Sequence, residues 1–395
     1  MTRSSQTSRL GAAVALAGLL TAWTAGAEET PPAPAPVPAP EPAFGWRDLF
    51  FDREDGAFDL SNLLQRGGFV PVPVIITEPA VDGGFGMVAQ FVTFPDGDPR
   101  YATRRMLGGA KTGNGSYGYG YMQTGHMLDH QVRYQIGIGR GDLTIATYPG
   151  DGDRALTYTS AYDYAIVGSA YWHLPVDTRF SAGPRINFRR LETRLDTSEV
   201  FPALGRDIGR TTTLGAAGFG LHFDDRDNPV TPTRGLNAYV NADMYNSAFG
   251  SDRDFELYTA AGYYFRPLSE KLRFGLMGKL STADSGVPFY LAPSVDLRGV
   301  EANRVQGQRA LSAEAQLTRQ LSDRWALDAF AGFGEAWAGD KTFFSDSGGI
   351  VTGGGGFRYR IASALGIDAG LDVAVGPEGP IVYIQFGSAW SRGMD

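Results

Sequence analysis

The sequence has no cysteine, no second long apolar run and no excess of basic residues. Without cysteine among its 395 residues, the chain does not depend on disulfide bonds. No run of roughly 20 apolar residues lies beyond the first 30 positions, which excludes a helical membrane protein. The formal net charge of −8 argues against a nucleic-acid partner, which would need a basic surface.

Glycine and aromatic residues, by contrast, are abundant. The chain has 53 glycines and 12% aromatic residues, and the glycines follow no Gly-X-Y period, which excludes collagen. Hydrophobic residues make up 43% of the chain, too many for a disordered protein. Because the glycines and tyrosines are spread over short alternating segments, one large all-β domain is expected.

The first residues have the pattern of a secretory signal peptide. Arg3 and Arg9 lie beside an apolar stretch from Leu10 to Trp23, and Ala25-Gly26-Ala27 offers a small-residue cleavage site. We therefore expect the chain to be exported and residues 1–27 to be removed.

The rest of the chain is expected to form a short lead and one long β domain. Residues 28–43 are a proline-rich linker with extended backbone. Residues 44–82 are a periplasmic or plug-like lead segment, where several prolines argue against an internal strand. Residues 83–391 are predicted to be a transmembrane antiparallel β-barrel, followed by a C-terminal tail at 392–395.

The β domain shows a two-residue alternation of apolar and polar side chains. In one segment Ile367, Leu371 and Val373 alternate with polar positions that include Asp368 and Asp372. A soluble sandwich and an outer-membrane barrel both produce this alternation. The export signal, the charges on the polar faces, the aromatic residues near strand ends and the alternation of short and long connections favour the barrel.

Fourteen strands are expected, and sixteen stay possible because one more hairpin fits into residues 56–82. The longer connections, at 95–112, 196–209, 287–308 and 339–349, are predicted to be outer loops. The fourteen expected strands cover residues 84–94, 114–126, 131–148, 155–174, 177–195, 210–225, 234–249, 252–268, 271–285, 309–321, 324–338, 350–363, 366–376 and 381–390.

Three segments of this domain have recognisable motifs. Residues 225–235 read DRDNPVTPTRG, residues 297–300 read LRGV, and residues 376–390 form a final hairpin that ends IVYIQFGSAW. In order and spacing they resemble a periplasmic turn, the Val-Arg-Gly-Phe/Tyr loop motif and the last hairpin of the BamA/TamA outer-membrane barrels, the bacterial surface antigen family. The stretch before the barrel is too short and too rich in proline for the POTRA domain that such proteins usually carry.

The resemblance implies that the loop motif, Leu297, Arg298, Gly299 and Val300, folds into the lumen. There Arg298 would pair with inward carboxylates such as Glu314 and Asp328 beside Phe330. The strand that in the family presents Phe-x-Asp-x-Gly reads FAGFG at 330–334, so the expected acid is absent and the partner of Arg298 stays open. The alternative is an ordinary solvated loop arginine.

Glycines at the two ends of the barrel are predicted to weaken a seam between the first and last strands. Gly84 and Gly86 lie in the first expected strand, and Gly387 lies near the end of the last one. Phe386 and Trp390 are expected on the lipid-facing side of that last strand. The resemblance adds that this end of the chain is an insertion signal read by the barrel-assembly machinery.

The resulting hypothesis is a POTRA-less BamA/TamA-type barrel that assists insertion or translocation of proteins, or of lipids, at the bacterial outer membrane. Its expected partners are outer-membrane lipid, unfolded outer-membrane or secreted client proteins, and the machinery that inserts it. The alternatives are a passive diffusion channel and a structural outer-membrane protein. Depletion of the protein distinguishes them by whether other barrels are lost.

No enzymatic activity, cofactor or metal is expected. The chain has no Gly-x-Ser-x-Gly elbow and no His-Glu-x-x-His zinc motif. The glycine run from Gly353 to Gly356 lacks the lysine and the strand-to-helix context of a phosphate loop.

Overall fold

The structure is a computed structural model of the chain. It describes residues 45–65, 68–93, 101–147, 156–196, 208–339, 341 and 348–390. The chain divides into two units, residues 1–44 and 45–395, and every described residue belongs to the second unit. The expected signal peptide, the proline-rich linker and the tail at 392–395 therefore lie outside the described residues.

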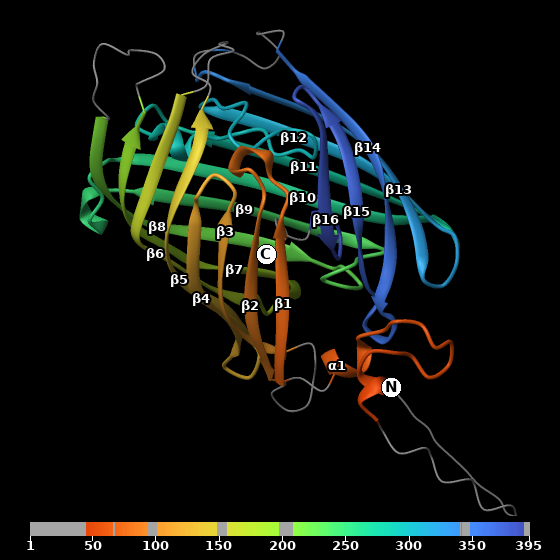
Figure 1. Cartoon of the computed structure of the whole chain (residues 1–395). Coiled ribbons are helices and arrows are strands. Elements are labelled where there is room, and N and C mark those ends of the chain that lie inside the picture. Colours follow the sequence, from red (N-terminus) through yellow and green to blue (C-terminus); the bar gives the residue numbers. More distant parts are fainter. Residues whose placement is uncertain are drawn as a thin grey trace, which may run out of the picture. The chain divides into compact units, whose positions relative to one another are not determined.

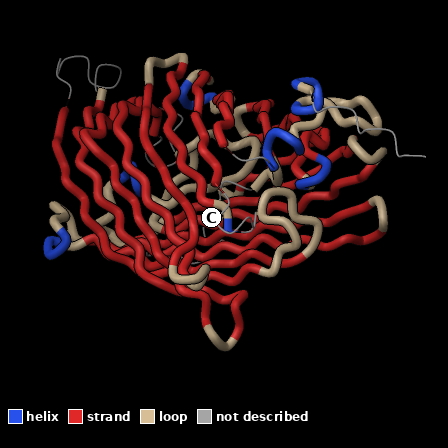
Figure 2. Tube along the Cα trace, turned by 90° about the horizontal axis from the view of Figure 1, so that it is seen from below, coloured by secondary structure: helices blue, strands red, loops and turns tan. Residues whose placement is uncertain are grey.

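Within the described residues, one antiparallel sheet of 16 strands is formed, and each strand pairs with the next along the sequence. Figures 1 and 2 show this sheet curling round on itself, which confirms the expected all-β antiparallel architecture. The strands are β1 (Gly68–Ile76), β2 (Gly84–Thr93), β3 (Thr103–Thr112), β4 (Tyr117–Met127), β5 (Val132–Thr147), β6 (Leu156–Leu174), β7 (Asp177–Leu195), β8 (Ile208–Asp224), β9 (Gly235–Tyr245), β10 (Phe255–Ser269), β11 (Leu272–Ala283), β12 (Arg309–Gln320), β13 (Trp325–Trp337), β14 (Ile350–Ala362), β15 (Ile367–Gly376) and β16 (Gly379–Phe386).

Helices are short and lie at strand ends and in connections. None of those among the described residues is long and apolar enough to cross a membrane. They are η1 (Trp46–Leu49), α1 (Ser61–Gln65), η2 (Pro79–Val81), η5 (Ser247–Phe249), η6 (Phe289–Leu291) and η7 (Ser363–Leu365).

Two strands were missing from the count of fourteen. β1 lies in the expected lead segment, so the sheet begins at Gly68 rather than at Gly83. Its prolines are tolerated because β1 is an edge strand, where a missing N–H can face away from the neighbour. β3 lies in the expected loop at 95–112, where a Gly-Gly pair interrupts the alternation. The described residues thus contain sixteen strands, the larger of the two expected counts, although only one of the two additional strands lies within residues 56–82.

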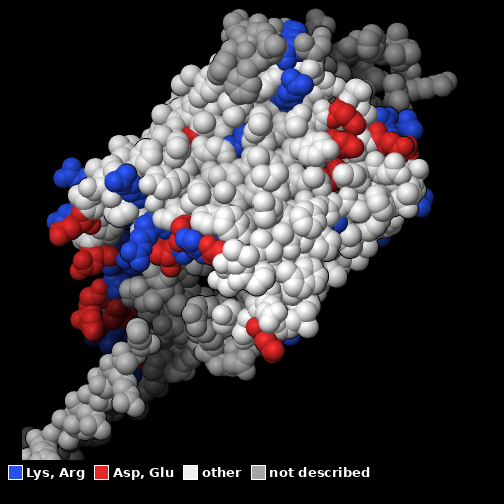
Figure 3. All heavy atoms as spheres, turned by 180° about the vertical axis from the view of Figure 1, so that it is seen from behind, with Lys and Arg blue, Asp and Glu red and all other residues white. Residues whose placement is uncertain are grey.

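Side chains alternate between two faces of the long strands. In β13 the exposed Trp325 and Leu327 alternate with the buried Ala326 and Asp328. Figure 3 shows one side of the molecule as a broad uncharged surface, with charged side chains gathered toward its margins. This is the pattern of a barrel whose outer wall faces lipid and whose inner wall is polar.

The two ends of the barrel differ in their connections. At one end, turns at 175–176, 270–271 and 321–324 join consecutive strands, and we call it the turn end. In outer-membrane barrels the short turns face the periplasm. From the opposite end, residues 284–308 connect β11 to β12, and we call them the inner loop because their inward course builds the site described next.

Candidate functional site

Apolar residues of the inner loop pack against the inside of the barrel wall. Val295, Leu297 and Val300 are each no more than 6% exposed and share one cluster with Tyr263 of β10 and with Trp390. Burial of each such side chain stabilises the packed loop by roughly 1.5–3 kcal/mol. The loop motif is therefore inside the barrel, as the resemblance implied, rather than in solvent.

Two glycines of β13 provide the space for these loop side chains. A methyl group added at Gly332 would lie 3.1 Å from the Leu297 Cδ2 atom, and one added at Gly334 would overlap Val295. The position where an acid was expected is thus occupied by an apolar contact. The carboxylates that bind the loop arginine come from other strands.

Arg298 is 7% exposed and is held by acceptors from two strands. Its Nε and Nη2 atoms donate to Glu314 Oε1 of β12 at 3.0 and 2.6 Å, and Nη2 also donates to Gln316 Oε1 at 2.8 Å. Nη1 donates to Asp372 Oδ2 of β15 at 2.7 Å. The guanidinium carbon lies 3.5 Å from the centre of the Phe330 ring, a cation–π contact. Arg298 therefore connects the inner loop to three strands of the wall.

A second arginine extends this network along the wall. Arg358 of β14 donates to both carboxylate oxygens of Asp372, at 2.6 and 2.9 Å, and lies 3.0 Å from Asp328 Oδ2. The charges thus alternate in the order Glu314, Arg298, Asp372, Arg358, Asp328. Opposite charges at each contact offset part of the cost of burying these ions.

A close backbone approach fixes the position of the loop. The φ angle of Gly299 is +92°, a conformation that favours glycine, and its N–H donates to the Tyr383 hydroxyl of β16 at 2.9 Å. A methyl group at Gly376 of β15 would overlap the Gly299 carbonyl oxygen. Only glycine at both positions lets the loop backbone touch the wall at this point.

The end of the chain also enters the barrel, which corrects one expectation. β16 ends at Phe386, which is 50% exposed on the outer face, and Gly387 then turns the chain with a φ of +78°. Trp390 is only 8% exposed, and its Nε1–H donates to Glu314 Oε1 at 2.7 Å. Trp390 is therefore a lumen residue and not, as predicted, part of the lipid-facing surface. The positive φ of Gly387 is the physical cause of the change in direction.

The turn between β8 and β9, residues 225–234, bridges two distant parts of the wall. Asn228 Nδ2 donates to the Leu365 carbonyl at 2.8 Å, and the Ser388 N–H donates to the Val230 carbonyl at 2.8 Å. The Asp368 N–H donates to Thr231 Oγ1 at 3.2 Å. The Asn-Pro and Arg-Gly pairs of this motif predict no more than a tight connection, but the turn also connects the middle of the sheet to its last strands.

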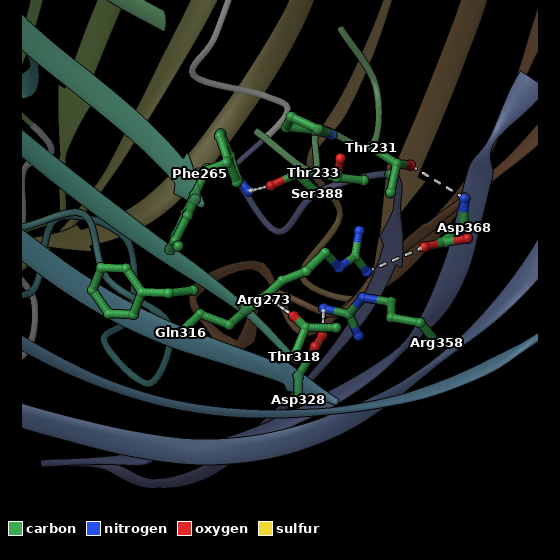
Figure 4. A pocket seen from close by; sticks show the side chains of 15 residues that line it. Thr231, Thr233, Phe265, Arg273, Gln316, Thr318, Asp328, Arg358, Asp368 and Ser388 are labelled. Atoms are coloured by element: carbon green, nitrogen blue, oxygen red, sulfur yellow. Dashed lines mark hydrogen bonds and ion pairs between the residues drawn. The ribbon is translucent and has the colours of Figure 1, made fainter. Parts of the chain in front are cut away.

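A small cavity lies between this turn and the wall. Figure 4 shows Thr231, Arg273, Asp328 and Arg358 around it, with the Arg358–Asp328 ion pair drawn as a dashed line. The lining contains both signs of charge. The cavity therefore adjoins the charge network rather than forming a separate site of one charge.

The sheet begins and ends in edges that do not pair with each other. Within the described residues, β1 pairs only with β2, and β16 only with β15. Gly84 and Gly86 lie on β2, so they are one strand away from the seam where they were predicted. The edge residues of the seam are those of β1, including Pro71 and Pro73.

The structure brings together part of the predicted set. Arg298, Glu314 and Phe330 meet directly, whereas Asp328 contacts Arg358. Asp372 was not among the predicted partners of Arg298. Its place on the polar face of its strand, taken together with the loop motif, is the sequence signal that indicates it.

Comparisons with known proteins are consistent with this architecture. A model of the Omp85 superfamily domain matches residues 154–386. No curated protein matches the chain. Among solved structures, BamA from Haemophilus ducreyi lacking POTRA domains 1–3 matches with a TM-score of 0.56 and 15% identity, over 82% of this chain and 70% of that chain.

Two further solved structures share the fold. CdiB from Escherichia coli matches with a TM-score of 0.54 and 10% identity, over 80% of this chain and 61% of that one. CdiB from Acinetobacter baumannii matches with a TM-score of 0.55 and 9% identity, over 80% and 59%. The chain thus spans about three fifths of the CdiB chains, and at these identities the likeness concerns the fold alone.

Proposed function

Because this chain belongs to the Omp85 superfamily, we propose that it inserts or translocates proteins, or lipids, at the bacterial outer membrane through the seam between β1 and β16. The observation that carries the proposal is that, within the described residues, the two edge strands β1 and β16 form no hydrogen-bonded ladder with each other. An exposed strand edge is a template to which an extended segment of another chain can add by backbone hydrogen bonds.

The sequence of β1 supports a seam that closes poorly. Pro71 and Pro73 are in register with Ala89 and Met87 of β2, and proline has no N–H to donate. In a paired strand the proline nitrogen faces away from the partner, which here is toward the open edge. The β1 edge therefore lacks two of the donors that a continuous ladder to β16 would need. A client strand would compete with an incomplete ladder rather than with a full one.

The interior of the barrel supports transport along the seam rather than through an open pore. The inner loop and Trp390 both occupy the lumen and converge on Glu314. Through Asp372, the same network also ties the loop to β15, which pairs with the edge strand β16. We infer that this part of the wall stays rigid while the seam opens.

Disulfide locking of the seam tests the proposal. Since the chain has no cysteine, one cysteine at Phe69 or Ile75 of β1 and one at Val382 or Phe386 of β16 are the only thiols available for a disulfide within the chain. We expect a locked seam to deplete other barrels from the outer membrane, as measured by proteomics, and we expect reduction to restore them.

The matched control is a cysteine pair inside the wall, at Leu276 and Ala315, which are directly opposite in the β11–β12 ladder. This pair should form a disulfide without affecting other outer-membrane proteins. If cells with a locked seam, or cells depleted of the protein, keep an unchanged outer-membrane proteome, the proposal is wrong. A channel or a structural protein would then explain the barrel.

A further inference from the structure

Residues 45–65, which we call the strap, are tied to the turn end of the barrel. Arg324, in the turn between β12 and β13, forms ion pairs with Asp52, Asp55 and Asp59 of the strap, at 2.8, 2.5 and 2.8 Å. The Leu60 N–H donates to the Ile361 carbonyl at the end of β14 at 2.6 Å. The strap therefore has a defined position beside β13 and β14.

Aromatic side chains of the strap continue a row that begins on the outer wall. The rings of Trp325 and Tyr359 lie 4.9 Å apart on the outward faces of β13 and β14. The Tyr359 hydroxyl donates to the Phe58 carbonyl of the strap at 2.9 Å. Phe58 forms a β-bridge with Phe51, and their rings lie 6.1 Å apart. The outer wall and the strap thus meet at the contact between Tyr359 and Phe58, with aromatic rings on both sides of it.

These aromatic rings are open to the surroundings. Phe51 is 38% exposed, Phe58 42%, Trp325 46% and, on the first turn of the strap, Trp46 72%. Where the strap meets the barrel, its negative charge is compensated, because three of its carboxylates pair with Arg324. Arg324 thus neutralises three aspartates of the strap, whereas its large rings stay uncovered.

We propose that the strap is an interfacial membrane element, with the rings of Trp46, Phe51 and Phe58 lying in the headgroup layer of the leaflet that borders the turn end. Aromatic rings concentrate at membrane–water interfaces, where an apolar body and a polar edge are both satisfied. The partner is phospholipid, because the strap adjoins the outer wall that faces lipid. Among the described residues, these rings stay exposed.

Site-directed spin labelling of the cysteine-free chain tests this placement. Phe51→Cys and Phe58→Cys would be labelled in the full chain, reconstituted in vesicles of phosphatidylethanolamine and phosphatidylglycerol. Glu54→Cys, on the same hairpin, is the matched control because Glu54 is an exposed charged residue. Collision with oxygen, which concentrates in lipid, is compared with collision with a nickel chelate, which stays in water.

At positions 51 and 58 we expect the spin label to collide more often with oxygen than with the nickel chelate. At position 54 we expect the opposite. The fluorescence of Trp46 is the part of the tryptophan emission that the Trp46→Phe variant lacks. Lipids brominated near the headgroup should quench this part, which tests the strap without altering either phenylalanine. Nickel reaching positions 51 and 58 as readily as position 54 would place the rings in water and overturn the proposal. Shielding from both reagents would overturn it too, since protein would then cover the row.

Discussion

Glu314 is the acceptor on which two distant segments of the chain converge. Its Oε1 atom accepts hydrogen bonds from Arg298 of the inner loop and from Trp390 near the chain end. The side chain is 1% exposed, so its charge is stabilised by these donors and not by water. A change at this one residue is therefore expected to release both segments.

The first prediction concerns that charge. Glu314→Gln keeps an acceptor oxygen but removes the negative charge beside Arg298, so we expect unfolding to become easier by about 3 kcal/mol, the lower end of the range for breaking a buried ion pair. The temperature at which the barrel loses its folded mobility in gel electrophoresis should fall, and protease should cut the inner loop faster.

The control for Glu314 is another ion pair of the same loop. Asp296 pairs with Lys279 at 2.6 Å, but its side chain is 66% exposed. Asp296→Asn should change stability by no more than about 1 kcal/mol, because water replaces the lost contact. Equal effects of the two substitutions would contradict the role given to Glu314.

A second prediction concerns the close approach of loop and wall. Gly376→Ala places a methyl group against the Gly299 carbonyl, so the loop must move, at a cost of about 1–3 kcal/mol for an overpacked contact. Gly278→Ala is the matched control on β11, because an added methyl group there meets nothing within 4 Å. Protease access to residues 284–308 should increase in the first variant and not in the second.

At the scale of elements, the alternation of apolar and polar residues was sufficient to locate a strand wherever the strand is long and its two faces differ. It located the fourteen strands other than β1 and β3. It failed at β3, where Gly108 and Gly109 carry no side chain to show a face, and at β1, where edge position overrides the usual exclusion of proline. Both strands form because they pair with their neighbours in the sheet. The sequence of a single strand does not contain this information.

The candidate site shows the same division. The loop motif predicted that Arg298 lies inside the barrel, and the charge of Glu314 predicted it as a partner, a contact that the structure contains. The inward turn that takes Trp390 to Glu314 depends on the backbone of Gly387, and a strand-like alternation of residues continues through that point. A side-chain pattern does not distinguish a strand that continues from one that ends.

A third prediction follows from the edge of β1. Replacing Pro71 and Pro73 by valine returns two N–H donors to this edge, so we expect β1 to pair with β16, amide hydrogens of both strands to exchange more slowly and the activity of the seam to fall. Pro79→Ala, in η2 and off the edge, should leave exchange in β1 and β16 unchanged. Exchange that stays fast in the double variant would show that the prolines do not hold the seam open.

At the scale of the whole molecule, the strap connects the start of β1 to turns between the last strands. Hydrogen bonding to Arg324 holds the pKa of Asp55 below its usual value. Burial opposes ionisation of Asp59, but hydrogen bonds from Ser363, Ser61 and Arg324 outweigh it and hold its pKa well below the usual range. These contacts span the seam at the turn end, where the strands themselves do not pair.

The fourth prediction is the pH dependence of this connection. Because both pKa values are lowered in the folded state, the ion pairs contribute stability above the usual aspartate pKa of 3.8 and lose it as the pH falls through the lowered values. A spin label at Phe51→Cys should stay immobilised from neutral pH to about pH 4 and become mobile only in stronger acid.

The matched variant for this prediction is Arg324→Gln, which should make the label mobile at every pH because the three carboxylates lose their common partner. Mobility that already increases between neutral pH and about pH 5 would contradict the assignment to these aspartates.

The buried position of Trp390 has a consequence for how a cell sorts finished from unfinished copies. A receptor for the chain end can contact this indole only before it reaches Glu314. If the chain end is the insertion signal that the resemblance implies, completion of the barrel makes that signal inaccessible. Mature copies, however abundant, would then not occupy the receptor that newly exported chains require.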